Sequence, residues 1–171
     1  SHVAFFIGLI IFYKLAILEK INYPLWSVIF LLIFPTSFFF ASVYTESLFF
    51  ALSVGTVYFL KKKQFLIAGI LGMLASATRL FGIFLIVFPI AEYMALPKKE
   101  RNLYKLLPTL LIPFGLIAYM VYLQQSLGDP LAFFHLQPKF GAERSGGNII
   151  LLPQVFWRYI KILFSSSFSL S

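Results

Sequence analysis

The segment 34–50, FPTSFFFASVYTESLFF, places a carboxylate between two apolar runs. A charged side chain at the centre of a bilayer costs about 2.5–3.5 kcal/mol on insertion scales, so Glu46 needs a reason to be there. With Tyr44 and Thr45 beside it, Glu46 offers oxygens that accept hydrogen bonds or a proton. The structural alternative is a helix start, favourable for a negative side chain, with Thr45 or Ser42 as its N-cap.

A second polar group, in SATRLFG, is Arg79 with Thr78 before it and Gly82 after it. A guanidinium stays charged and can donate two parallel hydrogen bonds to phosphate oxygens, and the Thr78 hydroxyl could add another. Gly82 would let a second backbone or a lipid tail approach closely. The alternative is an arginine that extends to lipid head groups and binds nothing specific.

The third polar group lies in 127–147, LGDPLAFFHLQPKFGAERSGG. Asp129 followed by Pro130 predicts the N-cap and first residue of a short helix, 130–137, that Pro138 ends. The segment is apolar enough to lie along a membrane surface, and the alternative is an ordinary interfacial helix followed by a glycine-rich linker. Three polar side chains belong to it: His135, Gln137 and Lys139.

The composition determines which elements carry these groups. Of 171 residues, 60% are hydrophobic and only 12% are charged, and the mean hydropathy is +0.90. A soluble domain is about half apolar and about a quarter charged, so this chain has too little polar surface to face water. Transmembrane barrels need alternating segments of about 10 residues, whereas these runs are continuous. The sequence therefore predicts an all-α, polytopic transmembrane helix bundle.

The apolar runs predict six to seven hydrophobic helices in one transmembrane domain, 1–171. The run 65–95 is too long for one crossing, because a straight helix of this length would extend about 46 Å. We therefore expect it to break at Thr78 and Arg79. The expected spans are 3–18, 25–41, 46–60, 65–78, 80–95, 104–123 and 155–170, with an extracytoplasmic loop over 124–153.

The net charge of +8 is distributed as a topology signal. If the chain weaves through these spans, its basic clusters share one side, which the positive-inside rule makes cytoplasmic. The opposite side then collects the connections 41–47, 78–81 and 124–153, which hold all three polar groups. The basic residues on the cytoplasmic side are Lys14, Lys20, Lys61, Lys62, Lys63, Lys98, Lys99, Arg101 and Lys105.

Other classes receive no support. The basic residues sit in short connections between apolar runs, so we expect no nucleic-acid partner. There is no cysteine, and no dinucleotide, P-loop, zinc-protease or serine-hydrolase motif. The chain begins SHVAFF and ends SSSFSLS, which we interpret as a piece of a longer protein.

The order of three blocks, FPTSFFFASVYTESLF, AGILGMLASATRLFGIFL and GDPLAFFHLQPKFG, resembles the PIG-V-like mannosyltransferases. These are relatives of GPI mannosyltransferase 2 in the GT-C class of polytopic glycosyltransferases. The resemblance covers about 34–141. In family members a tryptophan often follows the Gln that corresponds to Gln137, whereas this chain has Lys139-Phe140-Gly141, which bears on acceptor contacts.

The resemblance implies a membrane glycosyltransferase that transfers mannose from polyprenyl-phosphate mannose to an acceptor hydroxyl, with inversion, on the extracytoplasmic side. It implies an acidic catalytic residue upstream of this piece, with Glu46 as a lesser candidate. Arg79 would contact the phosphate, Glu46 and Tyr44 the sugar or acceptor, and 129–139 would close over the donor. A monophosphate leaving group does not require a divalent metal, and we expect no metal or other cofactor.

A transporter or flippase for a lipid-linked or small polar substrate is the alternative function, because intramembrane charges and broken helices also mark transport pathways. A catalytically inactive membrane scaffold is a third. The partners expected are the lipid-linked donor, membrane lipid and an acceptor. Usage rich in Phe, Ile and Lys favours the plasma membrane of a microbe over the endoplasmic reticulum.

Overall fold

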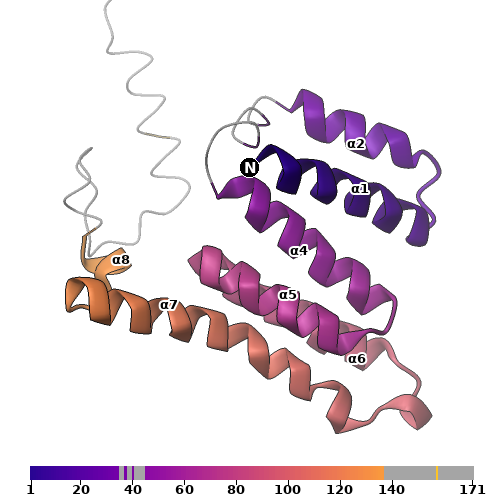
Figure 1. Ribbon diagram of the computed structural model, residues 1–171. Helices are drawn as coiled ribbons and strands as arrows, with labels where there is room; N and C mark the ends of the chain where they lie inside the picture. The colour runs from indigo at the N-terminus through magenta and orange to yellow at the C-terminus, as the bar shows by residue number, and fades with distance from the viewer. Residues whose placement is uncertain (35–36, 38–39, 41–44, 137–156, 158–171) are drawn as a thin grey trace, which may run out of the picture. The chain divides into compact units, whose positions relative to one another are not determined.

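The computed structural model describes residues 1–34, 37, 40, 45–136 and 157, and all regular structure within them is helical (Figure 1). The sequence predicts one domain, whereas the contacts divide the chain into two compact units, Ser1–Pro130 and Leu131–Ser171. Each unit is described by itself. The expected positions of Tyr44, Gln137, Lys139 and most of the span 155–170 lie outside the described residues.

The first unit begins with two helices, α1 (His2–Leu18) and α2 (Pro24–Ile33). The range of α1 agrees with the apolar run 3–18. The run 25–41, in contrast, does not form one helix, because α2 ends at Ile33. Proline follows Phe34 in the sequence and disfavours helical geometry there, and Phe34 is accordingly extended, with φ −58° and ψ 132°.

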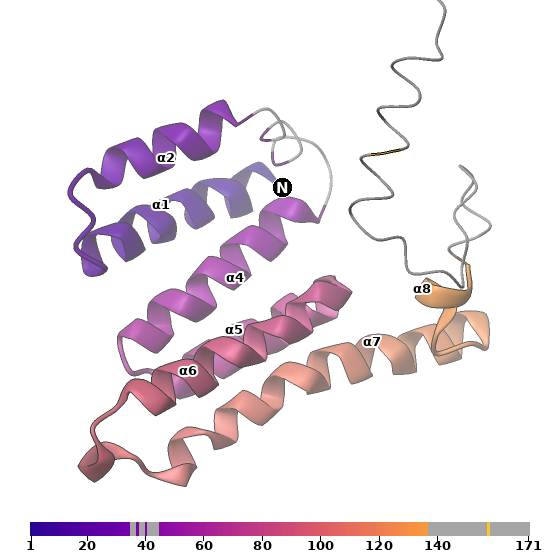
Figure 2. The same ribbon diagram turned by 180° about the vertical axis from the view of Figure 1, so that it is seen from behind.

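A helical hairpin follows, made of α4 (Glu46–Lys61) and α5 (Phe65–Thr78). The first arm ends where Lys63 adopts a left-handed φ of 59°. This conformation lets the Gln64 N–H reach the Phe59 carbonyl, at 2.9 Å, which is the six-to-one bond of a Schellman motif. The chain therefore reverses within a few residues, and the two arms lie side by side (Figure 2).

The predicted interruption of 65–95 is present at Arg79, which is extended with φ −148° and ψ 139°. A 3₁₀ segment, η1 (Leu80–Ile86), and α6 (Val87–Ala95) follow it. Gly82 is buried, and a Cβ on it would lie 2.5 Å from the Ser76 Cα and backbone N. The close approach that Gly82 permits is therefore to the backbone of α5.

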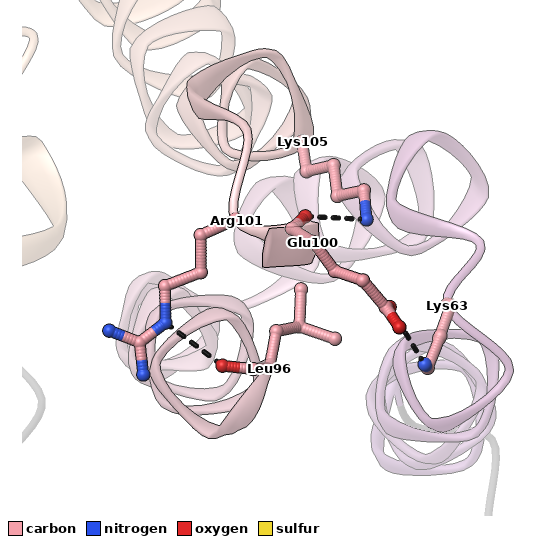
Figure 3. A network of polar contacts seen from close by, with 5 residues as sticks. All are labelled: Lys63, Leu96, Glu100, Arg101 and Lys105. Carbon is pink, nitrogen blue, oxygen red and sulfur yellow. Dashed lines mark hydrogen bonds and ion pairs between the residues drawn. The ribbon is translucent and has the colours of Figure 1, made fainter. Parts of the chain in front are cut away.

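A polar connection leads from α6 to α7 (Leu111–Leu127). Two contacts hold the connection, one to the turn between α4 and α5 and one to the end of α6. Lys63 Nζ lies 3.2 Å from Glu100 Oε2, and Arg101 Nε donates to the Leu96 carbonyl at 2.9 Å (Figure 3). Gly128, at φ 72°, ends α7. The connection contains three short 3₁₀ segments: η2 (Lys98–Glu100), η3 (Leu103–Lys105) and η4 (Leu107–Leu110).

The contact between α5 and α7 depends on small residues. A Cβ on Gly115 would lie 1.9 Å from the Met73 carbonyl oxygen, and one on Gly72 would lie 2.8 Å from Ile112 Cγ1. Ser76 donates its hydroxyl at this contact to the Ile112 carbonyl, at 2.5 Å. Close backbone approach through small and hydroxyl side chains is the usual packing between membrane helices.

The described residues bury few large apolar side chains and expose many. The inside is rich in small and hydroxyl side chains, while large apolar side chains such as Phe81 and Phe30 stay about two-thirds exposed, at 69% and 67%. Exposed apolar area of this extent needs an apolar environment or a partner to cover it. Buried small or hydroxyl residues include Ala16, Ser47, Thr56, Ala68, Ala75 and Ser76.

One helical stretch, Leu103–Leu127, is long and apolar enough to cross a membrane, with 25 residues and a mean hydropathy of 2.0. It contains the expected span 104–123. Four shorter apolar helical stretches have 10 to 17 residues: His2–Leu18, Pro24–Ile33, Phe65–Thr78 and Leu80–Ala95.

The second unit contains α8 (Ala132–His135), which is shorter than the predicted helix 130–137. Leu131 occupies its N-cap position, so the prediction that Asp129 caps it is wrong. Asp129 and Pro130 belong to the connection that follows Gly128. The dipeptide Asp-Pro is favoured in turns as well as at helix starts, which explains the misassignment.

Candidate functional site

Glu46 and Arg79, 33 residues apart in the sequence, form an ion pair in the structure. The Arg79 Nη2 donates a hydrogen bond to Glu46 Oε1. Both side chains are half-buried, with 36% of Arg79 and 23% of Glu46 exposed. The Phe49 ring lies near the guanidinium, with its centroid 6.0 Å from Arg79 Cζ. Two of the three predicted polar groups therefore meet.

The hairpin explains why they meet. Helix α4 has 16 residues and α5 has 14, so the two arms are nearly equal in length. In an antiparallel hairpin with equal arms, the residue that begins the first arm lies beside the residue that ends the second. Glu46 is the first residue of α4, and Arg79 directly follows α5.

The helix ends also favour these charges. Glu46 lies in the first turn of α4, where the helix dipole stabilises a negative charge, and Arg79 lies at the C-terminal end of α5, where it stabilises a positive one. The extended backbone of Arg79 releases its side chain from the helix. The ion pair, the two helix dipoles and the helix break therefore all contribute to the position of the Arg79 guanidinium.

The pair is incompletely satisfied. Glu46 Oε2 is buried and has no hydrogen-bond partner among the described residues. Leaving such an acceptor without a donor costs about 1–3 kcal/mol. On the other side of the pair, the hydrogen bond to Glu46 is the only one that the Arg79 side chain makes within the described part of the chain. A guanidinium has five N–H groups, so Arg79 retains donors for an anion.

The two predicted threonines do not supply ligand contacts in this conformation. Thr78 donates its hydroxyl to the Ala75 carbonyl at 2.7 Å, so that proton is already used within α5. Thr45 is exposed and occupies the N-cap position of α4, yet its side chain makes no capping hydrogen bond. Ser42, the other cap considered, lies outside the described residues.

Asp129, the member of the third polar group that lies in the first unit, is not brought to the ion pair. Helices α5 and α7 run parallel, since Gly72 faces Ile112 and Ser76 faces Gly115. Arg79 therefore lies at the level of the middle of α7. Asp129 follows the end of α7, roughly 15 Å further along its axis at the rise of an α-helix. His135 ends α8 in the second unit and is exposed.

A second charged cluster, which the sequence analysis missed, joins the ends of α1, α4 and α6. Lys61 Nζ lies 3.3 Å from Glu19 Oε1 and 3.2 Å from Glu92 Oε2. The hydrogen bond to Glu92 is the main reason that the pKa of Lys61 is raised, and the bond to Glu19 adds to it. The sequence contained a signal for this cluster: Glu19 and Glu92 each lie near the end of an apolar run, on the same predicted side as the lysines at 61–63.

The two clusters lie at opposite ends of α4, because Glu46 begins the helix and Lys61 ends it. At an α-helical rise they are about 22 Å apart. We call them the Arg79 end and the lysine end. The lysine end also receives the basic residues at 62–63, which the sequence places on the predicted cytoplasmic side.

Neither end has the donors of a metal site, since the described residues contain no group of three His, Asp or Glu side chains arranged to bind an ion. Comparisons with protein-family models, with curated proteins and with solved structures found no match to this chain.

Proposed function

We propose that the chain is part of a polytopic membrane glycosyltransferase that transfers mannose from polyprenyl-phosphate mannose to an acceptor hydroxyl. Two considerations support a membrane bundle: the large apolar side chains are exposed, and the α5–α7 contact is made through glycines and a serine. The observation that carries the functional proposal is the half-buried Glu46–Arg79 ion pair at a helix break.

The reaction sets the roles. The acceptor oxygen bonds to the anomeric carbon of mannose, the bond from that carbon to the phosphate oxygen breaks, and the acceptor proton passes to a carboxylate base. Polyprenyl phosphate leaves with the bonding electrons. Negative charge accumulates on its phosphate, which positive charge and N–H donors stabilise.

Arg79 supplies such donors. One N–H group binds Glu46, and this contact orients the guanidinium while the other N–H groups bind the phosphate. Glu46 Oε2 gains its missing hydrogen bond when a hydroxyl of the sugar or acceptor donates to it. The principal base is expected upstream of this piece. Other residues are candidates for substrate contacts outside the ion pair: Tyr44, Asp129, His135, Gln137 and Lys139.

The test uses membranes that contain the full-length protein and radiolabelled polyprenyl-phosphate mannose. Arg79→Gln should lower transfer by at least a hundredfold, because one charge-stabilising donor group contributes about 2.7–4 kcal/mol in comparable sites. Glu46→Gln should lower it less, since the amide oxygen can still accept from Arg79. Lys98→Gln, an exposed charge change in η2, is the control.

Transfer at the normal rate by Arg79→Gln, in protein that is inserted and folded, would remove the phosphate role. A transporter is the second candidate, favoured by the helix break at Arg79. It predicts that the labelled donor or its sugar crosses the membrane without formation of a new glycosidic bond.

A further inference from the structure

A small pocket between α1 and α4 at the lysine end is separate from the Glu46–Arg79 pair. Its volume is about 250 Å³. Two lysines line it, with two aliphatic side chains and one phenol between them: Lys14, Lys62, Ile17, Leu18 and Tyr58. The pocket is smaller than the usual range for drug-sized ligands, about 300–1,000 Å³, and matches a head group rather than a whole lipid.

The lysines of this pocket differ from their neighbours. Lys61 and Lys63 are each within 3.3 Å of a carboxylate. Within the described part of the chain, neither Lys14 nor Lys62 lies in an ion pair. Lys62 Nζ is instead positioned over the Tyr58 ring, 4.8 Å from its centroid. Two cations that share a pocket without a counter-ion favour the arrival of an anion.

The walls decide which anion fits. Ile17 and Leu18 are 52% and 40% exposed, so the pocket has an apolar border beside its charges. A soluble anion would leave that border in water, whereas a lipid would cover it with its glycerol and upper acyl chain. Basic pockets between membrane helices on the cytoplasmic side are the usual place for anionic head groups.

We propose that this pocket binds the head group of an anionic phospholipid, with its phosphate between Lys14 and Lys62. Tyr58 donates its hydroxyl to the same head group, and Ile17 and Leu18 contact the start of an acyl chain. Lys14, one turn before the end of α1, extends its ammonium toward the head-group level in the way long basic side chains do. The inference rests on the membrane bundle of the proposed function, and it is independent of mannosyl transfer.

The experiment uses the full chain in phosphatidylcholine nanodiscs that contain a trace of spin-labelled phosphatidylglycerol or spin-labelled phosphatidylcholine. The immobilised fraction of each label gives the preference for the anionic lipid. Wild type should prefer phosphatidylglycerol. Lys14→Gln or Lys62→Gln should each reduce that preference by about fivefold, as expected for one basic residue near an anionic lipid. The double variant should abolish it.

The matched control is Lys98→Gln with Lys99→Gln, two exposed changes of the same total charge in η2. It should keep the preference, and so should wild type in 20 mM inorganic phosphate, a concentration of the kind used to compete for a free phosphate site.

Three results would overturn the proposal: an unchanged preference in the double variant, an equal loss in the matched control, or a loss caused by inorganic phosphate. A chain that does not enter nanodiscs contradicts the membrane bundle and this site together. A chain that enters them but shows no preference contradicts this site alone.

Discussion

The two ends of α4 hold charge in different ways. At the Arg79 end, one carboxylate and one guanidinium form a half-buried pair, and one of the carboxylate oxygens has no donor among the described residues. At the lysine end, Lys61 has two carboxylates at similar distances: Glu92 is about as buried as Glu46, and Glu19 is more exposed. The first arrangement is sensitive to the loss of either partner, while the second is redundant. Two alternative carboxylates are suited to holding helix ends together. A single pair with an unused acceptor is suited to binding a ligand that supplies the missing donor.

The largest effect should come from charge reversal at the Arg79 end. Arg79→Glu places two carboxylates together at a half-buried position, so we expect a loss of about 3 kcal/mol, near the lower limit for breaking a buried pair. Thermal unfolding in detergent measures it. The swapped double variant, Glu46→Arg with Arg79→Glu, should recover part of the stability, because the ion pair forms again but against the helix dipoles. It should not recover mannosyl transfer, because the phosphate-binding cation has moved. Recovery of both would mean that the pair only stabilises the fold.

The next effect concerns the helix break that positions Arg79. Gly82→Ala introduces a Cβ that would meet the Ser76 backbone at 2.5 Å, and such overpacking costs about 1–3 kcal/mol. The melting temperature should fall, and transfer should fall with it as η1 shifts. Gly55→Ala is the control, because its new Cβ meets only the end of the Leu71 side chain, at 3.1 Å. Equal effects of the two variants would contradict the packing argument.

A smaller effect is expected at the lysine end. Lys61→Met should cost about 1 kcal/mol or less, because it removes a charge at an exposed helix end, where ion pairs contribute little, and places no like charges together. The raised pKa gives this difference a pH dependence. The ion pairs contribute fully below pH 10.5, the ordinary pKa of lysine, and their contribution disappears as the pH rises through the higher pKa of the folded state. Melting curves of both proteins between pH 9 and 12 should therefore converge, and a constant difference would exclude this cause.

The smallest effect should be a gain. Lys20, like Lys63, has a left-handed φ, of 56°, where glycine is better tolerated. Lys20 makes no ion pair within the described residues, so Lys20→Gly should raise stability by about 0.5 kcal/mol through relief of backbone strain alone. Lys63→Gly should gain less, since it also removes the contact with Glu100. A greater gain at Lys63 would show that the contact with Glu100 is unfavourable.

Much of the helical arrangement follows from apolar run lengths and the charges between them. The runs 3–18, 46–60 and 65–78 match helices to within a residue or so, and the break at Arg79 was expected from a run too long for one crossing. The end of α2 was missed because the run was counted without regard to the proline after Phe34. That rule was available in the sequence.

The candidate site was only partly predictable. Hydropathy places Glu46 and Arg79 at the same end of the hairpin. Their hydrogen bond also requires that α4 and α5 are nearly equal in length and that the Arg79 backbone is extended. Neither condition can be read from the residue types. The unexpected separation of Asp129 has a similar origin. Helix α7 continues well past the level of Arg79, because the offset between α5 and α7 is set by glycine contacts.

The 3₁₀ geometry of η1 changes the reach of the segment that follows Arg79. Its seven residues rise about 2.0 Å each, so they extend about 14 Å instead of about 10 Å. Placed end to end with the nine residues of α6, the segment would extend about 27 Å, close to the thickness of the hydrocarbon layer. A segment with too few residues to cross a bilayer as an α-helix can thus extend over almost the full thickness of the hydrocarbon layer when part of it is a 3₁₀-helix.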